Sequence, residues 1–163
     1  MHPHILADVA DFNLLDCALE DEPPRPGFSS RAIRVADEIG ARRLGASLYE
    51  LGPGERICPY HFHYANEEWL LVVSGAPTLR SPEGERALRA GDVVCFPTGP
   101  AGAHDVRNDG DDPARLLMIS TLIYPEVPVY PDSDKVGTRP VEIGGGDRLN
   151  FVRADAVDYW EGE

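Results

Sequence analysis

The strand pattern that begins at Leu44 is the feature that most constrains the fold. From this residue onward, short apolar or alternating runs are separated by glycine, proline and aspartate. Runs of this length between turn residues are typical of an all-β barrel or sandwich. The expected strands are Leu44–Leu51, Ile57–Tyr64, Glu68–Ser74, Pro77–Ser81, Arg86–Arg89, Asp92–Phe96, His104–Asn108 and Arg115–Ile123. Together they predict a jelly-roll barrel, also called a double-stranded β-helix, with few helices.

The segments that flank this strand region differ from it in composition. Residues 1–30 include a proline-rich stretch, Asp21–Gly27, which breaks regular structure and predicts an N-terminal arm. We expect the barrel domain to span 31–137 and a C-terminal extension to span 138–163. The apolar run Leu149–Trp160 predicts that this extension packs on the barrel or on a second subunit, and we expect a homodimer.

Three connecting segments carry turn or strap signals. Pro82–Glu85 separates two strand-like runs and predicts an exposed hairpin turn, because proline presets φ and glycine tolerates positive φ. Residues 124–137 contain several prolines, which remove donors from a ladder, so we expect a strap over the surface rather than a central strand. Gly144–Gly146 predicts a linker.

The size and charge of the chain bound its partners. It has 163 residues, enough for one domain with its own core, and carries 15 Lys and Arg against 28 Asp and Glu. A net charge of −13 repels phosphate backbones and anionic lipid surfaces, so we expect no nucleic-acid and no membrane partner. The N-terminus lacks a secretory signal and no apolar run approaches a membrane span, which predicts a cytoplasmic protein.

A histidine pair separated by one residue carries the clearest chemical signal. Residues two apart on a strand point to the same face, so the imidazoles of His61 and His63 meet at one point. Glu68 follows a short turn and begins the next apolar run, which brings its carboxylate beside both histidines. His104 follows the strand Asp92–Phe96 and a loop rich in glycine, and it supplies a fourth candidate ligand.

These four side chains predict one divalent metal ion. Imidazole suits iron, zinc, copper and nickel, and a carboxylate adds manganese, so we take zinc, iron, manganese or nickel as the candidates. Four protein ligands leave open positions on an octahedral ion, as a catalytic metal requires. Glu68 is also the candidate catalytic group, for proton transfer.

The same residues resemble the two sequence motifs of the cupin superfamily. The first motif, G-x5-H-x-H-x3–4-E-x6-G, is matched by His61, His63, Glu68 and Gly75. The second, G-x5-P-x-G-x2-H-x3-N, is matched by Gly91, Pro97, Gly99, His104 and Asn108. The opening glycine, Gly54, lies one residue further from His61 than the pattern asks, and four residues rather than two separate Gly99 from His104. Both departures fall in loops, where extra residues cost little.

The motifs and the strand pattern extend this resemblance over roughly residues 44–123. The chain looks most like a group of small single-domain bacterial cupins of uncharacterised function. The resemblance implies the barrel and the metal site, and it implies a metal-dependent enzyme that acts on a small molecule as a dioxygenase, an isomerase or a lyase. A non-catalytic cupin that binds or senses a small ligand is the alternative.

Several residues keep a second interpretation. An isolated H-x-H pair is more often structural, but the other ligands and the flanking glycines favour a metal. Glu67 competes with Glu68, although adjacent strand residues face opposite sides and the spacing to Gly75 favours Glu68. His2 and His4 repeat the spacing in a terminal arm, where a preorganised site is rare.

The cysteines and the aromatic residues near the motifs also remain open. Cys58 and Cys95 act as soft ligands or redox thiols, or they are small buried hydrophobic residues. The three cysteines, Cys17 included, contain no C-x-x-C pair, so we expect no disulfide framework and no cysteine-type zinc site. The aromatic residues either line a pocket or pack in the core or at a dimer contact. They are Tyr60, Phe62, Tyr64 and Trp69.

Overall fold

A computed structural model describes residues 10–23, 25–141 and 146–163 of the chain. His2, His4, Gly144 and Gly145 lie outside the described residues. The elements are β1 (Glu20–Asp21), β2 (Arg31–Ile33), α1 (Val35–Glu38), β3 (Leu44–Leu51), β4 (Phe62–His63), β5 (Glu68–Ser74), β6 (Thr78–Ser81), β7 (Gly84–Ala87), β8 (Val93–Phe96), β9 (Asp105–Arg107), β10 (Ala114–Thr121), β11 (Pro128–Tyr130), β12 (Lys135–Thr138) and β13 (Leu149–Val152), with 3₁₀ turns at Pro100–Gly102, Pro131–Ser133 and Arg153–Asp155.

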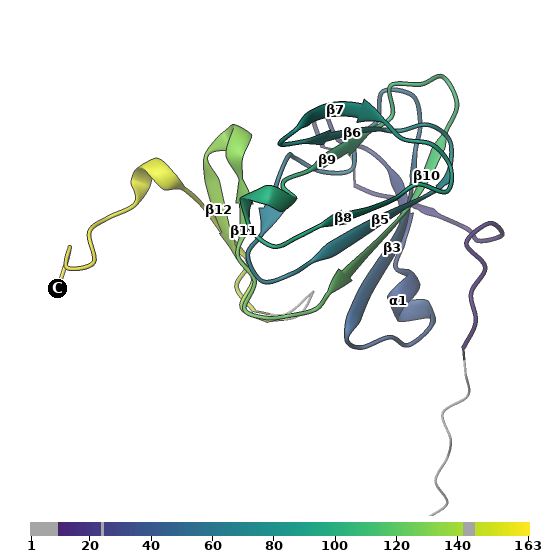
Figure 1. Cartoon of the computed structure of the whole chain (residues 1–163). Helices are drawn as coiled ribbons and strands as arrows, with labels where there is room; N and C mark the ends of the chain where they lie inside the picture. The colour runs from purple at the N-terminus through teal and green to yellow at the C-terminus, as the bar shows by residue number, and fades with distance from the viewer. Residues whose placement is uncertain (1–9, 24, 142–145) are drawn as a thin grey trace, which may run out of the picture.

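The strands form three antiparallel sheets (Figure 1). The largest has the order β1-β2-β3-β10-β5-β8, the second has the order β13-β12-β11-β4, and the third has the order β7-β6-β9. In Figure 1 the β7-β6-β9 sheet covers the strands β8, β5 and β10 of the largest sheet. This confirms the all-β jelly roll that the strand pattern predicts.

The main hydrophobic core lies between the largest sheet and the β7-β6-β9 sheet. The largest sheet contributes Leu51, Leu70, Val72, Phe96 and Leu116. Leu79 of β6 and Val106 of β9 contact them from the facing sheet. The core is therefore built from one face of each sheet, as strand alternation requires.

A second cluster covers the opposite face of the largest sheet. Leu117 belongs to this cluster whereas its neighbour Leu116 belongs to the main core, because successive side chains of β10 point to opposite faces. Val35 of α1 and Leu19 pack on this outer face. Helix α1 and the segment before β1 thus shield a sheet face that would otherwise be exposed apolar surface.

The expected strand Ile57–Tyr64 is mostly wrong. Only Phe62–His63 is a strand, and Arg56 and His61 make isolated bridges. Pro59 lies between them, and a proline cannot donate a hydrogen bond to a ladder. The interruption lies before His61, which directly precedes β4 but pairs with His104 rather than with β11.

The expected surface strap at 124–137 is also corrected. Residues Pro128–Tyr130 form β11, which lies centrally between β12 and β4. Pro128 is the first residue of β11, a position where a proline is tolerated because the strand begins there. The segment is therefore part of a sheet and brings its side chains to the candidate site.

The two ends of the described chain behave differently. Near the N-terminal end, β1 pairs with β2 and so joins the largest sheet. Near the C-terminal end, β13 pairs with β12, and the residues after β13 extend away from the barrel in Figure 1.

The described residues contain no helix long and apolar enough to cross a membrane.

Candidate metal centre

The position of His61 is set by direct pairing with His104. The N–H of His61 donates to the carbonyl of His104 at 3.0 Å, and the N–H of His104 donates to the carbonyl of His61 at 2.8 Å. Residues that exchange both hydrogen bonds are directly opposite, so their side chains lie on the same face. The rings of the two histidines accordingly lie 4.7 Å apart between centroids.

His104 is fixed by its ring contacts. Its ring stacks on Phe96 with a centroid distance of 3.8 Å and an interplanar angle of 10°. Nδ1 of His104 lies 2.9 Å from the carbonyl of Gly102. A carbonyl can only accept, so Nδ1 carries the proton and Nε2 keeps a lone pair. The loop before His104 thereby determines which nitrogen is available to a metal.

Replacing Gly102 with alanine is expected to displace this loop. An added Cβ would lie 1.8 Å from the carbonyl oxygen of Pro97, so the backbone must move. We expect a stability loss of about 1–3 kcal/mol together with weaker metal binding, because the move also shifts the carbonyl that orients His104. Denaturant unfolding and zinc titration measure both effects. Ala101→Ser, at an exposed neighbouring position, should change neither.

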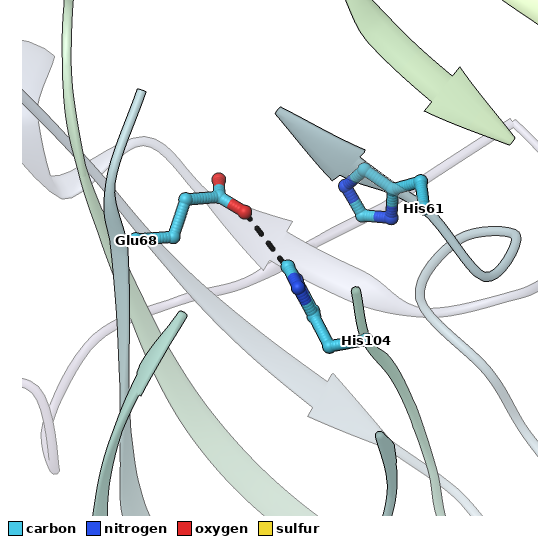
Figure 2. Close-up of side chains that lie close together, drawn as sticks. All are labelled: His61, Glu68 and His104. Atoms are coloured by element: carbon cyan, nitrogen blue, oxygen red, sulfur yellow. Dashed lines mark ion pairs between the residues drawn. The ribbon is translucent and has the colours of Figure 1, made fainter. Parts of the chain in front are cut away.

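Glu68 completes a group of three candidate ligands. Nε2 of His104 lies 3.3 Å from Oε2 of Glu68. One ligand atom from each of His61, Glu68 and His104 lies within 4.8 Å of the others. Figure 2 shows the Glu68 carboxylate and the His104 ring pointing toward one another, with the His61 ring beside them. This His-Glu-His group could hold a metal ion.

His63 lies next to this group, between two carboxylates. Its Nε2 is 3.3 Å from Oε2 of Glu68, and its Nδ1 is 3.4 Å from Oε1 of Glu126. The His61 and His63 rings meet edge to face at 4.8 Å. All four residues that the motifs predict are therefore neighbours, although the tightest group has three members.

Glu126 is the residue that the sequence did not point to. It is 4% exposed, lies more than sixty residues after His63, and contacts the amide nitrogen of Asn66 through Oε2. Asn66 is itself anchored, because its Oδ1 accepts from the N–H of Ile123 at 2.7 Å. No local pattern singles out Glu126, since its contact with His63 arises only when β11 pairs with β4.

Burial and the neighbouring carboxylates shift the pKa values of the three histidines in opposite directions. Burial lowers the pKa of His61 to about 3, and the neighbouring histidines add to this shift. Burial also lowers the pKa of His104. For His63, burial is outweighed by Glu126 and Glu68, which raise its pKa to about 9. For Glu68, burial is outweighed by the histidines, with His63 foremost, which lower its pKa to about 2.

Replacing Glu126 with glutamine is expected to weaken metal binding by at least about tenfold. A carboxylate that contacts the second nitrogen of a ligating histidine orients the ring and raises its basicity, and its loss typically costs this much affinity. Zinc titration of Glu126→Gln against wild type measures the change. Glu83→Gln, at an exposed hairpin turn, is the control. Equal affinity in wild type and Glu126→Gln would contradict this role.

The donor set fits a divalent ion. Glu68 Oε2 is buried beside the histidine nitrogens and has no hydrogen-bond partner among the described residues. Such orphaned polar atoms are costly unless a ligand or ion satisfies them. Imidazole nitrogens with one carboxylate oxygen match the preferences of zinc, iron, nickel and manganese.

Two cavities adjoin the group. A cavity of about 620 Å³ has His61, His63, Glu68 and His104 in its wall. A second cavity of about 350 Å³ shares the first three of these residues and is also lined by Glu126. Both volumes are in the range of small-molecule sites. A ligand bound in either cavity could therefore reach the metal group.

The alternative candidate ligands, Glu67, Cys58 and Cys95, are either exposed away from the histidines or protonated. Glu67 is exposed, next to Glu68 on the other face, and accepts a hydrogen bond from Trp69 at 3.0 Å. Burial raises the pKa of the Cys58 thiol, which keeps it protonated 3.6 Å from Nδ1 of His61. Cys95 is exposed and lies opposite Trp69 in the β5–β8 pairing. These observations favour a packing role for Cys58.

The four aromatic residues near the motifs pack or face solvent. Phe62 is buried in a small cluster, and Tyr60 lies 4.0 Å beneath the guanidinium of Arg80. Tyr64 and Trp69 are exposed. None of the four is among the described residues that line the two cavities. The aromatic rings beside the candidate ligands are instead Phe96, which stacks on His104, and Tyr130, which stacks on His61 with centroids 5.9 Å apart.

The chain is similar to known proteins over most of its length. Residues 47–120 match the family model of the cupin domain. The crystal structure of a candidate sugar phosphate isomerase from Acidithiobacillus ferrooxidans ATCC 23270 is 28% identical, with a TM-score of 0.79 over 89% of this chain and 91% of that chain. A sugar phosphate isomerase from a cupin superfamily, from Silicibacter pomeroyi DSS-3, is 25% identical, with a TM-score of 0.74 over 90% and 94%.

A more distant structure shares the fold alone. A protein from Thermotoga maritima that is predicted to be an oxalate decarboxylase is 16% identical, with a TM-score of 0.56 over 68% of this chain and 97% of that chain. The search of curated protein sequences found no match.

Proposed function

Because the chain belongs to the cupin superfamily, with its cupin domain at residues 47–120, we propose that it is a metal-dependent isomerase of a small sugar-type compound. The observation that carries this proposal is the group of His61, Glu68 and His104 in the wall of the larger cavity. In the proposal His63 is the fourth ligand. The two similar structures named as sugar phosphate isomerases support the choice of reaction, since each is similar over about nine tenths of this chain.

The proposed roles follow from the contacts of each side chain. A bound divalent ion would polarise a substrate oxygen. His61 and His104 would bind the ion through Nε2, because each Nδ1 lies 2.9 Å from a backbone carbonyl. Glu68 faces the histidines with Oε2, which leaves Oε1 to accept a substrate proton. Its low pKa keeps this carboxylate ionised, which is the form that binds a cation.

Isomerisation suits a site made of these groups alone. The reaction moves a proton between neighbouring carbon atoms and adds no atom, so no co-substrate is needed. The test uses protein loaded with zinc, manganese, nickel or iron(II) and a panel of aldose and ketose phosphates in D₂O. NMR should show interconversion, and deuterium should enter at the carbon next to the carbonyl. A chelator should abolish both signals.

Other outcomes separate the remaining functions. Oxygen uptake with iron(II) would contradict isomerisation and favour a dioxygenase. A metal-loaded protein whose melting temperature shifts with a panel member, but which neither converts it nor exchanges deuterium, would favour the non-catalytic binding module. Elemental analysis of protein expressed with ample metal should find about one ion per chain, and a folded, metal-free wild type would contradict the site.

We also propose that the chain forms a homodimer through its C-terminal extension. Tyr159 and Trp160 are 83% and 71% exposed, and Phe151 of β13 is 50% exposed. Large aromatic side chains gathered on one exposed segment are typical of interaction surfaces. Light scattering should give twice the mass of one chain, and a variant ending at Pro140 should be monomeric. A monomeric wild type would contradict the proposal.

A further inference from the structure

About half of the Lys and Arg side chains of this acidic chain form ion pairs with carboxylates. Of its 15 Lys and Arg residues, all of which the structure describes, eight form ion pairs with a described carboxylate. Four of the others line the two cavities at the candidate metal centre: Arg25, Lys135, Arg139 and Arg148. In a chain of net charge −13, unpaired positive charge gathered at one site favours an anionic ligand there.

Arg139 is held in place by neutral acceptors. Its Nη1 donates to the carbonyls of Thr138 and Leu149, at 2.9 and 3.1 Å. Its Nη2 donates to the hydroxyl of Tyr130 and to Oδ1 of Asn150, at 3.3 and 3.1 Å. The side chain is therefore fixed while its charge has no ion-pair partner among the described residues. A guanidinium prepared in this way can bind an anion with little loss of entropy.

Two structural links connect Arg139 to the metal group. The first runs through Tyr130, whose hydroxyl contacts Arg139 and whose ring stacks on His61. The second runs through Glu126, whose backbone exchanges two hydrogen bonds of 2.8 Å with the backbone of Arg139. Directly paired residues place their side chains on one face, so Arg139 lies on the same side as the carboxylate that contacts His63.

The smaller cavity contains this charge. Its lining includes Arg25, Arg139 and Arg148 as well as His61 and Glu68. The acidic residues in the same lining are engaged otherwise, because Glu68 belongs to the ligand group and Glu126 contacts His63 and Asn66. The three guanidinium groups therefore leave positive charge in the cavity lining that no carboxylate among the described residues pairs with.

We propose that this cavity of about 350 Å³ is an anion subsite, in which Arg139 with Arg148 and Arg25 binds the phosphate or carboxylate group of a small ligand. The four Nη hydrogens of Arg139 are already donated, so Arg139 would contribute its charge and its Nε–H. Arg148 and Arg25 would supply the paired hydrogen bonds that planar guanidinium groups make to such oxyanions. The other end of the ligand would reach the metal centre, and for that end the inference rests on the proposed function. Anion binding itself does not require the metal.

The test is calorimetric titration of inorganic phosphate into chelator-treated, metal-free protein. Wild type should bind phosphate, and Arg139→Gln should weaken binding by about tenfold or more, as expected for a lost charge-assisted hydrogen bond. Arg148 is exposed, so Arg148→Gln should stay folded and serves as the test if Arg139→Gln unfolds. Arg148→Gln should weaken phosphate binding by about threefold. Arg43→Gln, at an exposed and unpaired arginine outside both cavities, is the matched control.

The results distinguish a phosphorylated ligand from a carboxylate ligand, and they test the anion subsite separately from the metal-dependent function. Phosphate bound more tightly than acetate indicates a phosphorylated ligand, and equal binding of acetate indicates a carboxylate; both support the subsite. No binding of either anion, or an equal loss in Arg43→Gln, would overturn it. A protein that binds no metal but keeps Arg139-dependent phosphate binding would refute the metal-dependent function and leave the subsite standing.

Discussion

Replacing Glu68 with glutamine is expected to strip the metal ion and to lower isomerase activity by about 10³-fold or more, while the barrel stays folded. The amide has the same shape but no charge, so it binds a cation poorly and accepts no proton. It also leaves His63 and His104 without the carboxylate oxygen that lies 3.3 Å from each. Elemental analysis, the NMR assay and a thermal melt measure the three effects.

Glu67→Gln is the matched control for this variant. Glu67 has the same side chain one position earlier, but it is exposed and bonds Trp69 instead of the ligand group. It should keep its metal and its activity. The assignment of Glu68 is wrong if Glu68→Gln retains about one ion per chain, or if both variants lose metal equally.

Zinc affinity is expected to rise by about tenfold per pH unit between about pH 7 and pH 9. Only a neutral imidazole can bind a metal, and His63 has a pKa of about 9 in the metal-free protein. Below this pKa the ion must displace one proton from His63, so affinity falls as pH falls. His61, with its pKa lowered to about 3, and His104, with its pKa also lowered, are already neutral and add no further dependence in this range.

Competition with a chromophoric chelator at several pH values measures this dependence. Glu126→Gln removes one of the carboxylates that raise the pKa of His63, so its affinity should vary less steeply with pH than that of wild type. A wild-type affinity that is flat between about pH 7 and pH 9 would show that His63 is not protonated there or is not a ligand.

Local alternation was sufficient to predict the strands that carry continuous apolar runs. The expected Leu44–Leu51 and Glu68–Ser74 coincide with β3 and β5. The alternation also separated Glu68 from Glu67 correctly, because adjacent strand residues face opposite sides whatever the rest of the fold does. The spacing of His61, His63, Glu68 and His104 likewise identified residues that the structure brings together.

The same reasoning failed where pairing partners, rather than local pattern, decide the conformation. Ile57–Tyr64 carries a strand-like composition, but Pro59 interrupts its ladder and only Phe62–His63 remains a strand. Pro128–Tyr130 carries a proline, yet it forms a central strand because β4 and β12 supply partners on both sides. At β11, pairing with strands on both sides outweighs the local preference against a strand with a proline.

The sequence by itself thus determined the barrel, the histidine face and the carboxylate that lies beside it, because these depend on a period of two and on short spacings. Only the tertiary structure decided what surrounds the ligands. Glu126 contacts His63 and Tyr130 stacks on His61 because β11 pairs with β4. Arg139 is linked to them by its pairing with Glu126 and its contact with Tyr130. Those contacts join segments far apart in the chain, and their register is set by the packing of whole sheets, which no local pattern encodes.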